Sequence, residues 1–298
     1  MNIAEIIRNA FPFSVVRLPL TGPDGLVSPH YGLFRDDNSA SVGSAVTRKY
    51  VPHETDDVVA LAEAASLAFG DVADVKAHWK EGHYVVITQS ADSRRSVYDA
   101  RYPNSKGHQI RPDSDVYTPT MIIRAGYDGR AFSASLAVNR MVCRNLLTVP
   151  VQGKAVSRTI RHSNSLPGRI TDLVQDISLI VQQQDDLFNT IDQAARTTVD
   201  MAKFLRAVYP IPANSTVRQL KNFEQRIVDI MGRLYDERQK LGKTSNNSYD
   251  ATAWEAFNAV DGYDRWDRRR NSDPSQFDRD LLTNSDSSVQ RAAALAFS

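Results

Sequence analysis

Residues able to bind phosphate are concentrated between Arg94 and Arg169, where the chain holds 13 basic and 4 acidic residues. No aspartate or glutamate lies between Gly129 and Thr171. The whole chain has a formal net charge of +1, so this basic window is balanced by an excess of acidic residues elsewhere. Basic side chains without acidic neighbours attract phosphate groups. The charge pattern therefore predicts a nucleic-acid-binding surface.

Such a surface combines cations that neutralise phosphates with aromatic rings on which bases stack. Six arginines and one lysine of the window are the expected cations, and one tyrosine and one phenylalanine are the expected rings. The predicted binding residues are Arg124, Tyr127, Arg130, Phe132, Arg140, Arg144, Lys154, Arg158 and Arg161. If seven phosphates were neutralised, the logarithm of the binding constant for a single strand would fall with the logarithm of the salt concentration with a slope of about −5.

Two other interpretations of the same residues remain open. In a non-enzymatic structural or host-interaction protein, the arginines would pair with acidic helices of this chain or of a neighbouring subunit. The directions of Arg158 and Arg161, toward carboxylates or toward solvent, discriminate between this reading and nucleic-acid binding. A metal-dependent nuclease would need carboxylates that converge in three dimensions. We expect no enzyme, because the pairs Asp36-Asp37 and Asp56-Asp57 have local explanations in a turn and at a helix start.

The sequence predicts no cofactor and no metal. Neither phosphate-binding glycine motif, GxxxxGK[ST] or GxGxxG, is present, which disfavours ATP-driven and dinucleotide-dependent enzymes. The six histidines are far apart, and no pair has the spacing of a zinc site. A single cysteine, Cys143, fits a reducing cytoplasm. The N-terminus lacks a secretory signal and no apolar run reaches ~18 residues, so we expect no membrane association.

The elements that must position these residues indicate an α+β protein, with a strand-rich curved sheet and helices in the N-terminal half and a helical C-terminal half. We expect an arm over residues 1–30, a strand-rich α+β domain with the basic surface over 31–165, and a helical region over 166–298. Thr55 to Gly70 has the caps of a helix. Residues 119–125 and 130–137 form a predicted hairpin around Asp128-Gly129. Apolar residues recur at helical spacing between 166 and 241.

Four segments, taken in order, resemble the phage/plasmid-like protein family known as domain of unknown function 932. They begin near an acidic turn, continue through a glycine-flanked turn and a basic-apolar stretch, and end in an aromatic helix. The segments are Leu33-Phe34-Arg35-Asp36-Asp37 with Gly43 and Tyr50, Ala125-Gly126-Tyr127-Asp128-Gly129-Arg130-Ala131-Phe132, Arg140-Met141-Val142-Cys143-Arg144-Asn145-Leu146-Leu147 and Thr252-Ala253-Trp254-Glu255-Ala256-Phe257-Asn258-Ala259-Val260.

This resemblance implies a phage, prophage or plasmid origin and a bacterial cytoplasm, but no settled activity. A strand-rich, arginine-rich sheet backed by a helix is also similar in outline to phage single-strand annealing proteins, which is an analogy of fold alone. We therefore expect a protein that binds single-stranded nucleic acid in phage replication or recombination. A further hypothesis is that it also anneals complementary strands. Homo-oligomerisation would extend its groove, and phage replication or recombination proteins are the expected partners.

Overall fold

The chain forms two compact units, each assembled from three separate segments. Unit 1 takes residues 1–91, 119–137 and 155–184, and unit 2 takes residues 92–118, 138–154 and 185–298. These boundaries differ from the divisions at residues 30 and 165 expected from the sequence. The structure, a computed structural model, describes residues 1–43, 45–79, 82–99, 114–127, 131–141, 145–147, 149, 151, 156–243, 250–268 and 287–298.

The predicted α+β class is confirmed, with strands dominating the N-terminal half and helices the C-terminal half. The largest sheet has five neighbouring strands in the order β10-β8-β7-β5-β4, and unit 1 contains all of β4, β5 and β10 and most of β7 and β8. Their bounds are β4 Val72–Trp79, β5 Gly82–Gln89, β7 Val116–Gly126, β8 Phe132–Arg140 and β10 Ser157–Ile160. Antiparallel pairing sets Val85 opposite Ile123 and Ile87 opposite Met121. All four side chains are fully buried, so the centre of this sheet is apolar.

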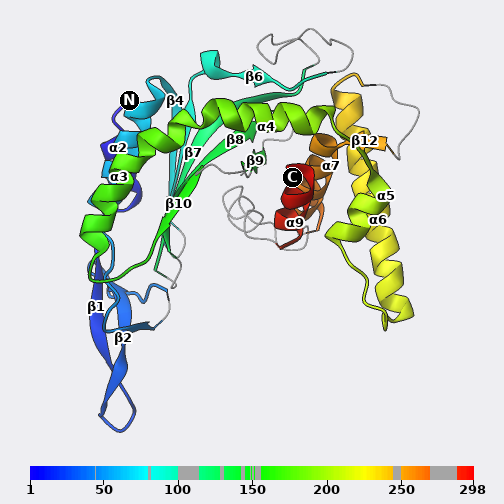
Figure 1. Cartoon of the computed structure of the whole chain (residues 1–298). Coiled ribbons are helices and arrows are strands. Elements are labelled where there is room, and N and C mark those ends of the chain that lie inside the picture. Colours follow the sequence, from blue (N-terminus) through cyan, green and yellow to red (C-terminus); the bar gives the residue numbers. More distant parts are fainter. Residues whose placement is uncertain are drawn as a thin grey trace. The chain divides into compact units, whose positions relative to one another are not determined.

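Three helices of unit 1 pack with this sheet, and their ends follow local capping signals. They are α1 Ile3–Ala10, α2 Thr55–Phe69 and α3 Leu166–Gln182. Helix α2 contacts α1 and β5. It also lies beside α3 (Figure 1). A reciprocal capping box between Glu54 and Asp57 starts α2, and Gly70, at φ 78°, ends it as predicted. Residues 3–11 are not a free arm, because Ile7 and Phe11 are buried in unit 1.

A second, three-stranded sheet of unit 1 has the order β1-β2-β3. Its strands are β1 Val15–Thr21, β2 Val27–Arg35 and β3 Val46–Thr47. The base of the β1–β2 hairpin packs into an apolar cluster that includes Leu33 and Tyr127. Farther along the hairpin, Leu26 and Val27 are 69% and 70% exposed. The hairpin therefore changes from buried to solvated along its length.

Unit 2 is mainly helical. Its elements are η1 Ala91–Ser93 (of which residues 92–93 lie in this unit), β6 Arg95–Ser96, β9 Asn145–Leu147, α4 Gln184–Arg196, β11 Thr198–Asp200, α5 Met201–Val208, α6 Val217–Lys240, β12 Asp250–Thr252, α7 Ala253–Gly262, the π-helical turn η2 Tyr263–Asp267 and α9 Ser287–Ala296. The apolar residues at helical spacing continue from α3 into α4, but a break at Gln183 separates the two helices. Trp254 and Phe257 on α7 are buried and contact Phe297. None of the helices in the described ranges is long and apolar enough for a membrane span.

Candidate functional site

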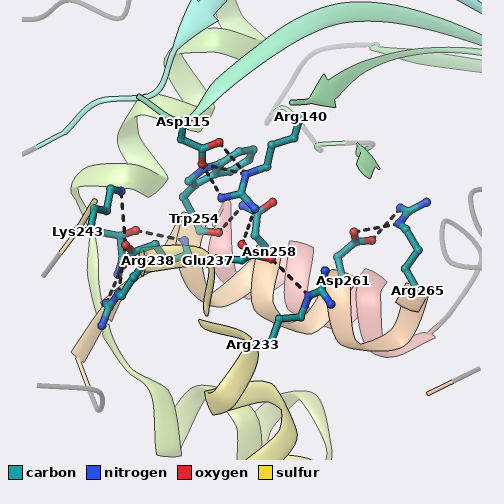
Figure 2. Close-up of polar contacts among 12 residues, drawn as sticks. Asp115, Arg140, Arg233, Glu237, Arg238, Lys243, Trp254, Asn258, Asp261 and Arg265 are labelled. Atoms are coloured by element: carbon teal, nitrogen blue, oxygen red, sulfur yellow. Dashed lines mark hydrogen bonds and ion pairs between the residues drawn. The ribbon is translucent and has the colours of Figure 1, made fainter. Parts of the chain in front are cut away.

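Arg140, a predicted phosphate ligand, is buried at the end of β8, with 1% of its surface exposed. Its Nε and Nη2 atoms contact the Asp115 carboxylate at 2.8 and 2.7 Å. Its Nη1 donates to Glu237 Oε2 at 2.6 Å (Figure 2). A cation that is buried between two carboxylates cannot reach a polynucleotide. The expectation that Arg140 neutralises a phosphate is therefore wrong.

The contacts of Arg140 extend into a larger buried network of unit 2, shown in Figure 2. Trp254 Nε1 donates to Asp115 Oδ2 at 2.8 Å, so that carboxylate is held by an arginine and an indole. Arg233 pairs with Glu237 at 3.3 Å and with Asp267 at 3.2 Å. The network therefore joins the segment before β7 and the end of β8 to α6, α7 and η2.

Three further ion pairs involve acidic residues of α7, and their cations Arg238, Lys243 and Arg265 are labelled in Figure 2. Glu255 pairs with Arg238 at 2.8 Å and with Lys243 at 3.5 Å. Burial alone would raise the pKa of Glu255, but the two cations outweigh burial and leave it below its usual value. Arg265 pairs with Asp261 at 3.1 Å and donates to the Leu146 carbonyl at 3.1 Å. These partners hold α7 and β9 together.

The pKa of Asp261 is raised, in contrast to that of Glu255. Burial raises it, and the neighbouring Arg265 only partly opposes that effect. A carboxylic acid with a raised pKa is a candidate proton donor when it faces a cleft. Asp261, however, is fully buried and directed at Arg265. Within the described ranges, no group of three or more His, Cys, Asp or Glu side chains could hold a metal ion. The geometry of the network thus supports a structural role.

The two aromatic residues expected to stack on bases are interior residues of unit 1. Tyr127 is 1% exposed, and its ring lies on His53 with centroids 4.3 Å apart and planes 10° apart. The Tyr127 hydroxyl donates to the His53 carbonyl at 2.7 Å. Phe132 is fully buried and meets the His53 ring edge-on at 5.3 Å. Neither ring presents a face to a base, so this expectation is also wrong.

His53 belongs to a buried histidine pair that sequence spacing did not reveal. His53 Nε2 and His83 Nδ1 are 2.8 Å apart, and His83 Nε2 is 3.3 Å from Thr55 Oγ1. Burial lowers the pKa of His83 to about 3, and burial together with His83 and His162 places the pKa of His53 well below its usual value. Both rings are therefore neutral at pH 7, and they pack as part of the core.

The remaining predicted cations fall into four groups. Arg124 is half-buried over the Tyr84 ring, with its Cζ 5.6 Å from the ring centroid. Arg158 on β10 is half-exposed and pairs with Asp176 of α3. Arg161 is exposed and makes no ion pair with a described residue. Arg130, Arg144 and Lys154, together with Cys143, lie outside the described residues.

Arg161 lies beside exposed cations that the sequence prediction missed. His162 stacks on Tyr50, with ring centroids 4.8 Å apart and planes 15° apart. Arg48 and Lys49 immediately precede that tyrosine, and both are exposed. The stack therefore brings residues 48–50 and 161–162 to the same part of unit 1.

Arg17 completes this group from strand β1. Its Nη1 donates to the carbonyls of Arg48 and Tyr50. The cations Arg17, Arg48, Lys49 and Arg161 are called the basic platform below. The basic window from 94 to 169 could not reveal three of the four, because they precede it by more than 40 positions in the chain. The Arg48-Lys49 dipeptide was the available signal.

A family model described as "Domain of unknown function (DUF932)" matches residues 44–295. The chain belongs to the DUF932 family. The match contains every residue of the buried network, and it begins after β1 and β2. No curated protein and no solved structure shows significant similarity to this DUF932 protein.

Proposed function

We propose that this DUF932 protein binds single-stranded nucleic acid through the basic platform of unit 1. The observation that supports the proposal is that four cations gather around the Tyr50–His162 stack without a carboxylate partner among the described residues. Uncompensated surface cations attract a polyanion and release its counterions. The binding would be passive and independent of base sequence.

Side-chain contacts already hold the backbone of the platform in place in the free protein. The Arg17 guanidinium lies 4.9 Å from the Tyr31 ring centroid and also donates to two carbonyls of residues 48–50. His162 Nδ1 donates to the Val51 carbonyl at 3.1 Å. These contacts hold the two cationic segments together before a ligand arrives, which reduces the ordering entropy that binding must offset.

The platform sets the expected salt dependence. Four neutralised phosphates give a log–log slope near about −3 for a single strand. The magnitude is smaller than that expected from seven cations, because the platform neutralises four phosphates instead of seven. The setting in phage replication or recombination, and strand annealing as the outcome, are parts of the proposal that rest on the resemblance to phage and plasmid proteins.

The test is a titration of the full chain with a labelled oligothymidylate at several salt concentrations. The double variant Arg48→Gln/Arg161→Gln should bind more weakly and reduce the magnitude of the salt slope by about 1.4. Lys76→Gln is the matched control, because Lys76 is an exposed cation of unit 1 that pairs with Asp74 outside the platform. An unchanged slope in the double variant, or an equal loss in the control, contradicts the proposal. Magnesium-dependent loss of the label would indicate a nuclease instead.

The exposed β1–β2 hairpin supports a second candidate, a structural or host-interaction protein. Leu18, Leu26 and Val27 are 49%, 69% and 70% exposed, and exposed apolar residues of this kind favour protein contacts. The internal Arg158–Asp176 pair also fits that reading. Under this alternative the protein self-associates through the hairpin. Sedimentation of Leu26→Ser/Val27→Ser against the unmodified chain tests it, since a monomer in both cases would exclude self-association.

A further inference from the structure

A cleft of unit 2 lies between the segment after α5 and the N-terminal half of α6, and we propose that it binds a nucleoside monophosphate. The cleft has a volume of about 360 Å³. This volume is at the lower end of the range for small-molecule sites, which is about 300–1,000 Å³. It therefore suits one nucleotide and not a dinucleotide. The proposal concerns a different surface from the basic platform and does not depend on it.

Two arginines supply the charge of the cleft, and no carboxylate is among the lining residues. Arg226 lies over the Tyr209 ring at 4.6 Å, and its buried Nε has no hydrogen-bond acceptor among the described residues. Arg291 Nε donates to the Val208 carbonyl at 2.7 Å, which leaves its terminal nitrogens to bind a ligand. Both guanidinium groups are thus positioned by the protein but not neutralised by it.

The carboxylate that contacts the Tyr209 hydroxyl, Asp264, is already occupied. The Tyr209 hydroxyl donates to Asp264 Oδ2 at 3.1 Å, and the Ser288 hydroxyl donates to the same oxygen. Arg268 pairs with Asp264 Oδ1 at 3.2 Å. Because three donors hold Asp264, the charges of Arg226 and Arg291 remain available to an external anion. Paired arginines match the geometry of phosphate oxygens.

One face of α6 adds both polar and apolar groups to the cleft. Gln219, Asn222, Phe223 and Arg226 follow the spacing of a single helical face and all line the cleft. Gln219 Oε1 accepts from the Thr216 backbone, so its amide nitrogen remains a donor. Phe223 provides a ring on which a base can stack.

The opposite side of the cleft is apolar. It is formed by the chain that follows α5, where Pro210, Ile211 and Pro212 line the cleft. Two cations with amide donors at one part of the cleft and an apolar wall at another match a ligand with a phosphate and a planar group. A nucleoside monophosphate has that combination of groups, whereas inorganic phosphate and a nucleoside each have one part of it.

The test is isothermal titration of the full chain at low salt with adenosine monophosphate, inorganic phosphate and adenosine. Adenosine monophosphate should bind about tenfold more tightly than either fragment, because it engages both parts of the cleft. Arg226→Gln and Asn222→Ala should each weaken its binding. Asn222→Ala is included because that side chain makes no hydrogen bond with a described residue, so its removal leaves the fold intact.

Arg218→Gln is the matched control, because it removes one cation from the same helix outside the cleft. It should leave the affinity for adenosine monophosphate unchanged. The proposal is overturned if adenosine monophosphate shows no saturable binding, if inorganic phosphate binds equally well, or if Arg218→Gln weakens binding as much as Arg226→Gln. Oligothymidylate binding by Arg226→Gln should equal that of the unmodified chain, which separates this site from the basic platform.

Discussion

Arg140 and Asp115 form a two-point ion pair inside unit 2, and neither side chain is more than 2% exposed. The pair joins the end of β8 to the residue before β7, and Trp254 and Glu237 add one contact each from α7 and α6. A buried pair is stable when each charge also has further hydrogen bonds, as here. Arg140 thus acts as a junction between strand and helix segments of unit 2.

Replacing Arg140 by methionine should destabilise the protein strongly. Methionine replaces the apolar stem of the arginine by an unbranched chain, but it leaves Asp115 and Glu237 buried without their common cation. Loss of one partner of a buried pair typically lowers the free energy of unfolding by about 3–5 kcal/mol. Urea denaturation measures this change. Arg48→Gln, at an exposed position, should remain within about 0.5 kcal/mol of the unmodified chain, and equal effects of the two variants would refute a structural role for Arg140.

Trp254→Phe should have a smaller but clear effect. The phenyl ring retains most of the buried apolar surface but loses the Nε1 hydrogen bond to Asp115. A hydrogen bond to a charged group contributes about 1.5–3 kcal/mol. Trp79→Phe is the comparison, because Trp79 makes ring contacts with Phe13 but no hydrogen bond among the described residues. Urea denaturation should rank Trp254→Phe as clearly the less stable variant, and the reverse order would contradict this account.

Acidification should destabilise the folded state already at pH values well above those at which carboxylates titrate. The pKa of His83 is about 3 in the folded protein, and that of His53 is also strongly lowered, so the unfolded chain binds more protons below about pH 6.5. Stability is therefore complete above about pH 6.5 and falls as the pH decreases. Each of the two histidines contributes up to about 1.4 kcal/mol per pH unit.

Urea midpoints measured between about pH 7.5 and pH 5 check this slope. Carboxylates of the unfolded chain titrate at about pH 4, so they contribute little in that interval. The variant His83→Gln should show a flatter dependence on pH in that interval. His30→Gln is the control, since His30 is exposed on β2. A stability that stays constant down to pH 5 would show that the two rings are not buried in their neutral form.

Gly82→Ala should disturb the start of β5. A methyl group at this position would lie 2.4 Å from the Ala125 carbonyl oxygen, and the backbone φ of 152° disfavours a side chain. We expect a loss of about 1–3 kcal/mol from the clash and strain. Gly232→Ala on exposed α6 meets no atom within 4 Å and should stabilise the protein by about 0.5–1 kcal/mol. Thermal unfolding of the two variants should shift in opposite directions.

Local sequence signals predicted local structure well. Helix α2 ends at Gly70 as expected, because a glycine at positive φ is sufficient to stop a helix. Proline is disfavoured within strands because it has no backbone N–H, yet Pro19 lies within β1. This strand is at the edge of its sheet, where a missing N–H is tolerated, and its register shifts directly after Pro19.

The candidate site could not be predicted in the same way, because its contacts join distant residues. The lack of acidic residues near Arg140 and Arg158 in the sequence indicated unpaired cations. In the folded protein Arg158 pairs with Asp176, and Arg140 pairs with Asp115 and with Glu237. Two of these three carboxylates, Asp176 and Glu237, lie beyond the basic window. Charge counted along a chain therefore does not measure charge in space.

The division of each unit among three chain segments has a consequence for synthesis on the ribosome. The last segment of unit 1 ends at residue 184, so this unit can be completed while the helices after α4 are still being made. Arg140 and Asp115 are translated before Glu237 and Trp254. Nascent unit 2 therefore holds an unfinished charged junction until Trp254 has been translated, and chaperone binding during that interval would protect it.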